Sequence, residues 1–351
     1  MPSAKRVLCA MSGGVDSSVA AALLVEAGYD VFGVTLHLWD AADDQKVGRC
    51  CAPEDRDDAR RVSEHIGIPH YVVDERAAFR AHVVDPFLGA YASGTTPSPC
   101  VSCNRTVKLA FLADLADRLG ASYIATGHYA RIEPGPRLLR GVDRNKDQSY
   151  FLFGVPPAVL ARLLFPLGAL TKHEARAEAR RFGLPNADKP DSVELCFVPD
   201  GDVAGFSARE GSGAPGGRIV DEAGRTLGAH DSVAGFTIGQ RRGLGLGGGP
   251  PRYVLRILAD TGAVVVGPKE RLLTSTARVV EATWPGGRPD SPFEAAVRIR
   301  YRHAPAPAVV TPSEEGFEVR FHSPQRAITP GQAGVVYRGD EVVAGGVIAS
   351  S

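Results

Sequence analysis

Apolar and polar positions follow two different periods along the chain, and the change between them divides the sequence. In residues 1–200, short apolar runs alternate with stretches in which apolar residues recur at the spacing of one helix face. The apolar runs predict buried strands, and the periodic stretches predict helices. The predicted strands are Arg6–Ala10, Val31–Leu38, Pro69–Val73 and Ser122–Thr126, and the predicted helices are Ser17–Ala27, Glu54–Ile66 and Thr106–Leu119. Strands separated by such helices predict right-handed crossovers and a doubly wound parallel α/β sheet.

Beyond residue 200 the pattern changes to short β-like runs separated by turns. Residues 201–217 are rich in Gly, Ser and Ala, which is typical of a connector. The strand candidates are Gly217–Val220, Phe236–Ile238, Tyr253–Ile257, Val264–Val266, Ala296–Arg302, Phe317–Phe321 and Gly334–Tyr337. We therefore predict a small β-rich central domain in residues 201–275 and a C-terminal β-barrel in residues 276–351.

Composition removes several classes of protein. The 351 residues include 40 basic and 40 acidic side chains, so a nucleic-acid partner must be argued from local patches. No apolar run is long enough to span a bilayer, and the N-terminus carries no signal-peptide pattern, so we expect a cytoplasmic protein without a membrane partner. Six cysteines are too few for a disulfide scaffold, and in a reducing compartment they are expected to be buried, metal-bound or catalytic.

A glycine loop joins the first predicted strand to the first predicted helix. In AMSGGVDSS, residues 10–18, two adjacent glycines allow a sharp turn and the close approach of a ligand. Ser17 and Ser18 can bond the first helix amides, and the amides of such a turn point at an anion. The loop lacks the lysine of the GxxxxGK[ST] pattern. It resembles the pyrophosphate loop of enzymes that split ATP into AMP and pyrophosphate, in which Asp16 would help to place Mg²⁺ or the loop. A tight turn without a ligand is the alternative.

Cys100 and Cys103 form a CxxC in a predicted Pro- and Ser-rich loop, TPSPCVSCN at residues 96–104, which precedes a predicted helix. A thiol near a helix N-terminus can have a depressed pKa and be partly thiolate at neutral pH. On its own the spacing fits a redox pair, half of a zinc site or chance, and no second CxxC completes a structural zinc site. We expect Cys9 to lie in the core and Cys196 to lie in a loop-like stretch. Cys50 and Cys51 precede a predicted helix and are unassigned.

Seven motifs, taken together, give the chain a family resemblance. They are SGGVDSS at 12–18, PCVSCN at 99–104, TGHYAR at 126–131, KDQSYFL at 146–152, CFVP at 196–199, FTIGQRRGLG at 236–245 and SPQRAITPGQ at 323–332. In this order they resemble the bacterial tRNA-specific 2-thiouridylases of the MnmA type, in the ATP pyrophosphatase (PP-loop) superfamily, which has an adenine nucleotide alpha hydrolase-like fold. Each motif alone is weak or moderate, whereas the ordered set over nearly the whole chain is highly specific.

This resemblance implies an ATP-dependent tRNA sulfurtransferase. AMP transferred to the C2 oxygen of wobble uridine 34 turns a very poor leaving group into a good one, and pyrophosphate leaves. Sulfur carried as a persulfide on a cysteine then attacks C2 and expels AMP, giving 2-thiouridine. The implied cofactors are ATP and Mg²⁺. The implied partners are the tRNAs for Lys, Glu and Gln and a sulfur donor such as a cysteine desulfurase or a relay protein.

Residue roles carry over from the family where the motifs match. Cys103 resembles the nucleophile and Cys196 the persulfide carrier, and the two could close a transient disulfide. The implied ATP-binding residues are Ala10, Met11, Ser12, Gly13, Gly14, Val15, Asp16, Ser17, Leu36 and Gly127. The residues implied beside the target base are Ser98, Pro99 and Cys100. Those implied to face the tRNA are His128, Lys146, Asp147, Gln148, Arg300, Tyr301 and Gln332.

The residues around Arg300 also point to RNA without the resemblance. Arg298, Arg300 and Arg302 alternate with apolar residues, and period two predicts one basic face of a strand. Such a row suits contacts with phosphates, and an ordinary solvated face is the alternative.

The role of Cys100 is open, because part of the family has Asp at this position and a thiol titrates well above a carboxylate. Cys100, Cys103 and Cys196 could instead hold a [4Fe-4S] cluster with one iron left open, so the cluster and the persulfide are rival routes for sulfur. Two rival functions also stand. An amide-forming synthetase of the same superfamily has no need of Cys103 and Cys196, and a non-catalytic tRNA-binding protein releases no pyrophosphate.

Overall fold

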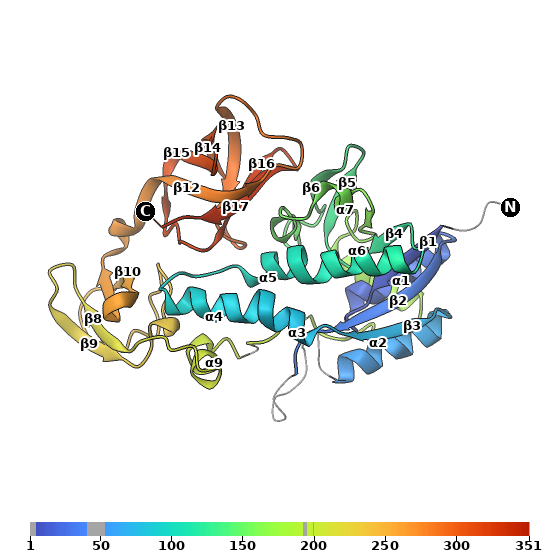
Figure 1. The fold of residues 1–351 in the computed structure, drawn as a ribbon, viewed down its shortest axis with the longest axis horizontal. Helices are drawn as coiled ribbons and strands as arrows, with labels where there is room; N and C mark the ends of the chain where they lie inside the picture. The colour runs from blue at the N-terminus through green and yellow to red at the C-terminus, as the bar shows by residue number, and fades with distance from the viewer. Residues whose placement is uncertain (1–4, 41–52, 192–194, 199, 351) are drawn as a thin grey trace. The chain divides into compact units, whose positions relative to one another are not determined.

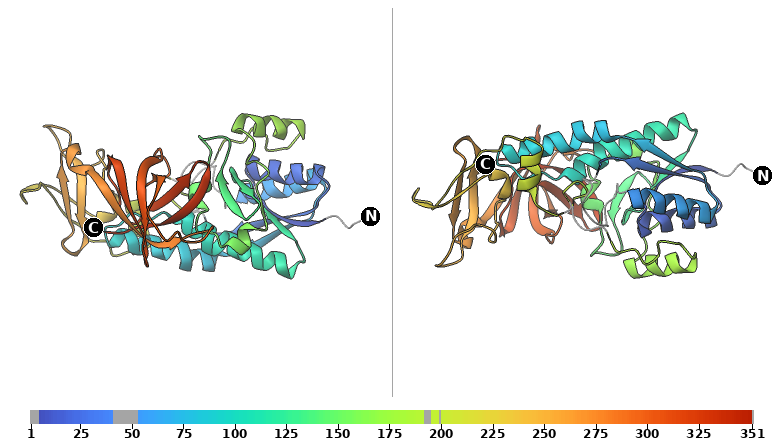
Figure 2. Two further views of the ribbon diagram at one scale, coloured as in Figure 1. Left: turned by 90° about the horizontal axis from the view of Figure 1, so that it is seen from above. Right: turned by 90° about the horizontal axis from the view of Figure 1, so that it is seen from below.

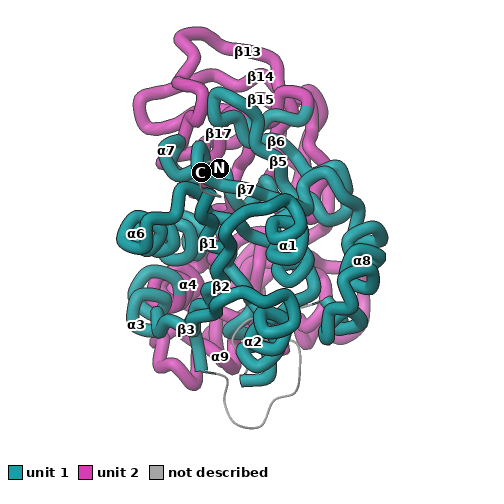
Figure 3. The backbone as a smooth tube through the Cα atoms, turned by 90° about the vertical axis from the view of Figure 1, so that its right-hand side faces the viewer, with its two compact units in different colours: residues 1–83, 100–199, 340–342 teal, residues 84–99, 200–339, 343–351 magenta. Residues whose placement is uncertain are grey.

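The computed structural model describes residues 5–40, 53–191, 195–198 and 200–350, so Cys50, Cys51 and Pro199 lie outside the described residues. The chain forms two compact units (Figure 3). Unit 1 comprises residues 1–83, 100–199 and 340–342, and unit 2 comprises residues 84–99, 200–339 and 343–351. Within the described part of the chain, no helix is long and apolar enough to cross a membrane.

Unit 1 is built on a five-stranded parallel sheet in the order β3-β2-β1-β4-β7. The strands are β1 (Arg6–Ala10), β2 (Asp30–His37), β3 (His70–Asp74), β4 (Tyr123–Ala125) and β7 (Leu163–Leu164). The main helices are α1 (Val15–Glu26), α2 (Pro53–Ile66), α6 (Leu109–Arg118) and α8 (Lys172–Arg181). Figure 3 shows α6 on one side of the sheet and α1, α2 and α8 on the other. This arrangement confirms the predicted doubly wound α/β fold.

The core of unit 1 explains why α1 lies against the sheet. Val19 and Ala21 of α1 are fully buried with Val7 of β1, and Ala59 of α2 and Ala175 of α8 belong to the same apolar cluster. Small side chains at these positions let the three helices approach one another closely. The first strand and the first helix, which flank the glycine loop, are therefore held by the buried core of the unit.

The helix around the CxxC begins earlier than predicted. A helical path starts at Pro99 with α5 (Pro99–Ser102) and continues through η2 (Cys103–Lys108) into α6. The expectation of a loop up to residue 104 was wrong because proline, with its fixed φ, is well suited to the first position of a helix. Both cysteines of the CxxC consequently lie on helical backbone.

Helix α8 was missed by the sequence interpretation, although the chain carries its start signal. Thr171 and Glu174 form a capping box in which Thr171 N donates to Glu174 Oε2 at 2.7 Å and Glu174 N donates to Thr171 Oγ1 at 3.2 Å.

The shorter helices of the chain are α3 (Arg76–Phe79), η1 (Arg80–Val84), α4 (Asp85–Ala92), η3 (Ser149–Phe151), α7 (Pro157–Leu160), α9 (Val203–Arg209), η4 (Val233–Gly235), η5 (Ala259–Thr261) and η6 (Lys269–Leu272).

Unit 2 contains two β structures, as predicted (Figures 1 and 2). A four-stranded sheet has the order β10-β11-β8-β9, with β8 (Gly217–Val220), β9 (Thr226–His230), β10 (Tyr253–Leu258) and β11 (Ala263–Gly267). Six antiparallel strands in the order β12-β15-β14-β13-β16-β17 close into a barrel through a β12–β17 pairing. They are β12 (Leu273–Thr283), β13 (Phe293–Arg298), β14 (Ala306–Pro312), β15 (Gly316–Arg326), β16 (Ala333–Arg338) and β17 (Glu341–Ile348). Glu341, the first residue of β17, belongs to unit 1 and pairs there with Leu139 of β6 (Arg137–Arg140), which forms a hairpin with β5 (Ala130–Glu133).

In unit 2, one predicted strand is wrong and another extends past the end of the observed strand. Phe236–Ile238 follows the short helix η4 and enters a turn, in which Gln240 Oε1 accepts a hydrogen bond from Thr237 N at 2.8 Å. Ala296–Arg302 ends as a strand at Arg298, and residues 299–302 form a bend and turn. In both places side chains bond to nearby backbone and compete with ladder pairing, which period-two counting does not detect.

Candidate nucleotide site and cysteine segments

The predicted nucleotide-binding residues meet at one edge of the parallel sheet. Strands β2 and β4 run parallel to β1 on either side of it, so their carboxyl ends lie together. Ala10, Leu36 and Gly127 stand at or just beyond these ends, where ligands bind in open α/β sheets. Gly127 touches the glycine loop, because a Cβ added to it would lie 2.7 Å from Ser17 N. The structure therefore brings these sequence-predicted positions together.

Gly13 gives the loop its shape. Its φ of +76° lies in the left-handed region, and a Cβ at this position would overlap the carbonyl oxygen of Asp55 at the start of α2. Gly14 adopts an extended conformation (φ −83°, ψ 158°) as the N-cap of α1. The loop thus turns between β1 and α1 while its backbone packs directly against the backbone of α2.

The serines of the loop do not cap α1, contrary to the sequence prediction. The hydroxyls of Ser17 and Ser18 each donate to Gly14 O at 3.0 Å, and Ser12 N donates to Ser17 Oγ at 3.1 Å. The N-cap makes no side-chain hydrogen bond to the helix. Because the first amides of a helix have no intrahelical acceptor, the start of α1 presents N–H groups and the positive end of the helix dipole to an anion.

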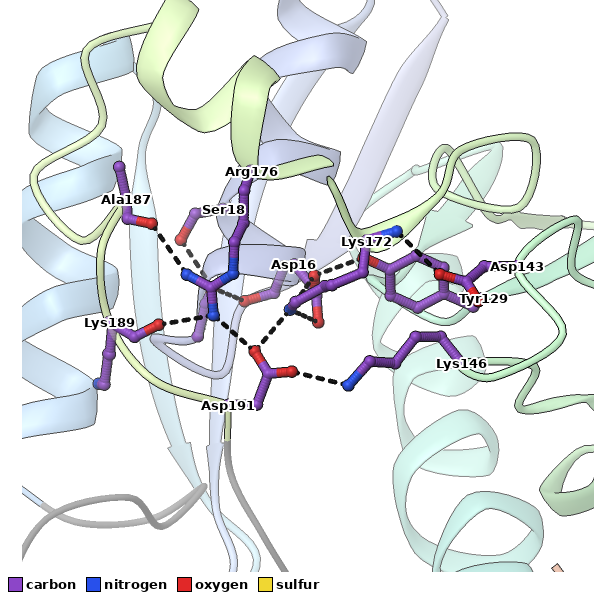
Figure 4. A network of polar contacts seen from close by, with 12 residues as sticks. Asp16, Ser18, Tyr129, Asp143, Lys146, Lys172, Arg176, Ala187, Lys189 and Asp191 are labelled. Carbon is purple, nitrogen blue, oxygen red and sulfur yellow. Dashed lines mark hydrogen bonds and ion pairs between the residues drawn. The ribbon is translucent and has the colours of Figure 1, made fainter. Parts of the chain in front are cut away.

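Asp16 belongs to a network of charged side chains (Figure 4). Lys172 Nζ donates to its two carboxylate oxygens at 2.8 and 2.9 Å, and Tyr129 Oη donates to Oδ1 at 2.8 Å. The same ammonium group lies 2.8 Å from Asp191. Asp191 also receives Lys146 at 2.7 Å and Arg176 at 2.8 Å. Three cations and two carboxylates are thus paired beside the N-terminus of α1.

The network shifts the acidity of its members. Burial alone would raise the pKa of Asp191, but the hydrogen bonds from Lys146 and Lys172 outweigh it and hold this pKa well below 3.8. Burial and the neighbouring Asp16 carboxylate raise the pKa of Tyr129 far above 10, so its hydroxyl remains a hydrogen-bond donor at neutral pH. At neutral pH the site therefore holds Asp191 as a carboxylate that accepts hydrogen bonds and Tyr129 as a phenol that donates one.

Sequence reasoning missed most of this network. It named Asp16 and Lys146 but gave no role to five residues that follow or lie in α8: Lys172, Arg176, Asn186, Lys189 and Asp191. The detectable signals were the capping box at Thr171 and the polar sequence DKPDS at 188–192. Neither signal indicates that the segment returns to the glycine loop, because that depends on the packing of α8 against α1.

His128 follows Gly127 and is held as a neutral imidazole. Its Nδ1 lies 2.7 Å from Thr126 Oγ1. Burial, aided by the charge of Lys108, lowers the pKa of His128 to about 3. An unprotonated ring can exchange hydrogen bonds with a base or ribose but brings no positive charge to a phosphate.

The three predicted tRNA-facing residues 146–148 have different surroundings. Asp147 is buried, with Oδ1 accepting from Gly141 N at 3.2 Å and from Ser149 N at 3.1 Å, so its carboxylate shapes the loop. Gln148 Oε1 accepts from Tyr129 N at 3.0 Å. Lys146 keeps 40% of its side chain exposed while it pairs with Asp191. Of the three, Lys146 has the side chain that is both charged and accessible.

The cysteines differ in burial. Cys9 in β1 is fully buried, and burial raises the pKa of its thiol to about 12, as expected for a core residue. Cys103 is buried at the start of η2, and Cys100 and Cys196 are partly accessible. All four are thiols rather than disulfides. Cys196 lies in a turn closed by a bridge between Leu195 and Val198.

An aromatic cluster anchors the residue after Cys196. The ring of Phe197 lies 5.7 Å from Phe79 and 6.4 Å from Trp39 between ring centroids. In the described parts of the chain, no group of three or more His, Cys, Asp or Glu side chains could hold a metal ion. Cys100, Cys103 and Cys196 are accordingly not gathered into one ligand group in this structure.

In unit 2, Arg298 and Arg300 donate hydrogen bonds to backbone carbonyls. The strand face predicted for the arginines is absent: Arg298 is buried and donates to the carbonyls of Tyr301 and His303. Arg300 Nη2 donates to Arg326 O at 2.9 Å and to Ala327 O at 2.6 Å. These bonds fix the turn that carries Tyr301.

Gln332 ties the loop before β16 to the segment that leads into the CxxC. Its Nε2 donates to Thr96 O at 3.0 Å and to Pro97 O at 3.1 Å. Thr96 N donates in turn to Pro330 O at 3.0 Å. A Cβ at Gly331, whose φ is +88°, would come within 2.9 Å of Thr96 O. This close backbone contact holds residues 96–97, just before the predicted target-base positions Ser98 and Pro99.

Comparison with known proteins agrees with this arrangement. The chain is 55% identical to the tRNA-specific 2-thiouridylase MnmA of Sorangium cellulosum, over 99% of this chain and 92% of that protein. The chain belongs to the tRNA-specific 2-thiouridylase family, a family of tRNA sulfurtransferases. It is also 49% identical to the protein of the same name from Geobacter metallireducens, over 98% of this chain and 96% of the relative. The resemblance drawn from the seven motifs is thereby confirmed.

Three family models match consecutive parts of the chain. Their descriptions are tRNA methyl transferase HUP domain for residues 5–200, tRNA methyl transferase PRC-barrel domain for residues 209–268 and Aminomethyltransferase beta-barrel domain for residues 274–348. A solved 4-thiouridine synthetase–RNA complex with bound ATP is similar over 59% of this chain and 50% of that chain, with 15% identity and a TM-score of 0.38.

Proposed function

We propose that the protein is an ATP-dependent sulfurtransferase that replaces the C2 oxygen of wobble uridine 34 in tRNA with sulfur. The observation that carries this proposal is the glycine loop, whose α1 amides face the carboxyl edge of the sheet, in a chain 55% identical to a tRNA-specific 2-thiouridylase. We further propose the division into a catalytic domain (1–200), a central domain (201–275) and a tRNA-binding barrel (276–351), which lies close to the bounds of the three family matches.

In this proposal, ATP binds along Ala10–Ser17 with its base between Leu36 and Gly127. Its phosphates accept hydrogen bonds from the first amides of α1. The Asp16 carboxylate beside these amides fits a Mg²⁺ ion, which proteins usually hold through one or two carboxylates together with substrate phosphates. Bound Mg²⁺ would neutralise part of the phosphate charge.

The first step is adenylation of the uridine. Its O2 attacks the α-phosphorus of ATP, the bond from that phosphorus to the bridging oxygen breaks, and pyrophosphate leaves with the electron pair. Lys172 lies between Asp16 and Asp191, so it can exchange a carboxylate for a phosphate oxygen and compensate the charge that develops on pyrophosphate. The leaving group at C2 is now AMP rather than oxide.

The second step transfers sulfur from Cys196, which carries it as a persulfide. The terminal sulfur attacks C2 and AMP leaves, so that uridine and Cys196 are joined through two sulfurs. The Cys103 thiolate then attacks the Cys196 sulfur, and the bond between the two sulfurs breaks with its electron pair moving to the uridine sulfur. The products are 2-thiouridine and a Cys103–Cys196 disulfide, which a cytoplasmic thiol reductant returns to two thiols. No step is routed through an iron–sulfur cluster.

The remaining predicted residues recognise tRNA in this proposal. Ser98, Pro99 and Cys100 lie beside the target base, and neutral His128 exchanges hydrogen bonds with the tRNA. Lys146, Arg300 and Tyr301 contact it as well, while Asp147, Gln148 and Gln332 shape the loops that do so. The substrates are the tRNAs for Lys, Glu and Gln, and a cysteine desulfurase or a relay protein supplies the persulfide sulfur.

Nucleoside mass spectrometry tests the proposal. Unmodified tRNA is incubated with the protein, Mg-ATP, a cysteine desulfurase and cysteine, and the digest is searched for 2-thiouridine. We expect product with the wild type and with Cys9→Ala, and none with Cys103→Ser or Cys196→Ser. A parallel incubation with S-adenosylmethionine searches for methylated uridine, because two family models are named for methyl transfer.

The outcomes separate the rival functions. Methylated uridine without 2-thiouridine would establish methyl transfer instead. Pyrophosphate release that persists in both serine variants, without thiolation, would indicate a synthetase of the same superfamily. Binding of tRNA without any pyrophosphate release would leave only a binding protein.

A further inference from the structure

Two side chains that follow α8 hold the carbonyl of Gly13. Asn186 Nδ2 donates to Gly13 O at 3.0 Å, and Lys189 Nζ donates to it at 3.2 Å. They are 173 and 176 residues away in the sequence, and neither belongs to a motif that indicated the family. Figure 4 shows Lys189 on the same loop segment as Ala187 and Asp191, which passes Ser18.

Both donors are themselves fixed. Asn186 is 5% exposed, and its Nδ2 also donates to Ser18 Oγ at 2.9 Å. Because a carbonyl oxygen only accepts, the amide nitrogen and not the amide oxygen must face Gly13. Lys189 forms ion pairs with Asp55 and Asp58; burial lowers its pKa, but these carboxylates outweigh that effect and raise it above 10.5, so the ammonium group stays charged.

The planarity of the peptide bond transmits this constraint to the next residue. In a trans peptide, the carbonyl of Gly13 and the N–H of Gly14 point in opposite directions. Holding Gly13 O toward Asn186 and Lys189 therefore turns Gly14 N–H to the opposite side of the loop. Between two glycines such a peptide would otherwise rotate easily, because neither residue has a Cβ to restrict it.

We infer that Asn186 and Lys189 are positioning residues that orient the Gly14 amide toward the phosphates of the nucleotide. The inference rests on the proposed function, because it requires a phosphate-bearing ligand at the loop. A carbonyl that accepts hydrogen bonds, one of them from a cation, also polarises its own peptide and makes the N–H a better donor to an anion. The two residues thus act on the phosphates without touching them.

Calorimetric titration with pyrophosphate and, separately, with adenosine tests the inference on the full chain. Asn186→Asp keeps the shape of the side chain but places a carboxylate oxygen against Gly13 O. We expect it to weaken pyrophosphate binding by about tenfold or more and to leave adenosine binding within about twofold. Lys189→Met should weaken pyrophosphate binding to a smaller extent, and Lys189→Arg should recover it because the donor and the charge are retained.

Two comparisons separate positioning from damage to the fold. Asn104→Asp is the matched control, because Asn104 is also buried and donates to a carbonyl, that of Phe151, at 3.4 Å. It should leave pyrophosphate binding unchanged. For Asn186→Asp, the deficit relative to wild type should shrink as the pH falls, because a protonated carboxyl can again donate to Gly13 O.

Each result is decisive. If wild type binds neither pyrophosphate nor adenosine, the proposed nucleotide site fails. If wild type binds both and the Asn186 and Lys189 variants bind pyrophosphate equally well, the inference fails while the function stands. An equal loss of adenosine and pyrophosphate affinity, or a deficit that does not change with pH, would overturn positioning in favour of a general structural role.

Discussion

The two units restrain their functional loops with different chemistry. Around the glycine loop of unit 1, charged side chains pair with each other, as when Lys172 bridges Asp16 and Asp191. In unit 2, Arg300 and Gln332 donate to backbone carbonyls. A side-chain carboxylate in an ion pair can give way to a phosphate without moving the backbone, whereas giving up a hydrogen bond to a backbone carbonyl releases the loop that the bond holds. The first arrangement is therefore suited to exchanging partners when an anion binds, and the second to keeping one loop shape.

The largest effect is expected where the backbone itself makes the contact. Gly13→Ala should abolish ATP binding, because the new Cβ overlaps the backbone of Asp55 and the left-handed conformation is strained for alanine. Gly28→Ala is the matched control, since Gly28 has a φ of +81° but nothing within 4 Å of the added Cβ. It should cost about 1–2 kcal/mol of stability and keep ATP binding. Equal ATP affinity in both variants, measured by titration, would contradict the role given to the loop.

The corresponding change in unit 2 is Gly331→Ala, which would bring a Cβ within 2.9 Å of Thr96 O. We expect it to displace residues 96–97 and lower the rate of thiolation while ATP binding stays at the wild-type value. Loss of ATP affinity in this variant would show that the two regions do not act separately.

Removal of the bridging cation comes next. Lys172→Met leaves Asp16 and Asp191 without the ammonium group between them, beside the proposed phosphate site. We expect kcat/KM for ATP to fall by about 100-fold, which corresponds to roughly 2.7 kcal/mol of transition-state stabilisation. Steady-state pyrophosphate release measures this, and Lys172→Arg should recover part of the loss. An unchanged kcat/KM would remove Lys172 from the mechanism.

A smaller effect is expected for the amide of unit 2. Gln332→Ala removes the donor shared by Thr96 O and Pro97 O, so we expect a loss of about 1–3 kcal/mol in the free energy of unfolding. The KM for tRNA should rise and the KM for ATP should not. Urea denaturation and steady-state kinetics check the two parts, and a change in the KM for ATP alone would contradict the division of roles.

The smallest effect is expected on the stability of the protein at acidic pH. The lowered pKa of Asp191 means that its carboxylate contributes stability above its unfolded pKa of about 3.9, and that this contribution is lost as the pH falls through the folded value. Asp191→Asn should therefore lose less stability than wild type when the pH falls below about 4. Gln332→Ala should keep the wild-type slope, because an amide paired with carbonyls does not titrate. Thermal melts across this range measure both slopes.

How far the sequence predicts the molecule depends on the range of each signal. The parallel sheet, the loop at residues 10–18 and the closed barrel follow from local periodicity and motifs, which packing then respects. The ends of elements were less accurate: Pro99 began a helix inside a predicted loop, and Arg298 ended a strand that alternation had extended to Arg302. Local side-chain and proline effects decided both.

The charged network could not be predicted, for a different reason. Asp16 and Lys172 are 156 residues apart, and their contact exists because small residues let α1 and α8 pack closely. No sequence pattern in either segment indicates that it contacts the other. The roles of Cys103, Cys196 and the tRNA-facing residues came from the resemblance, and they stay predictions until the variants are measured.

The reactivity of Cys9 reports how often the parallel sheet opens. Its thiol is fully buried in β1, between β2 and β4, and burial raises its pKa to about 12. An alkylating reagent can therefore modify Cys9 only in molecules whose central strand has separated from its neighbours. Its slow labelling beside the faster reaction of Cys100 and Cys196 would report the free energy of that opening, with and without nucleotide, in a single mass spectrum.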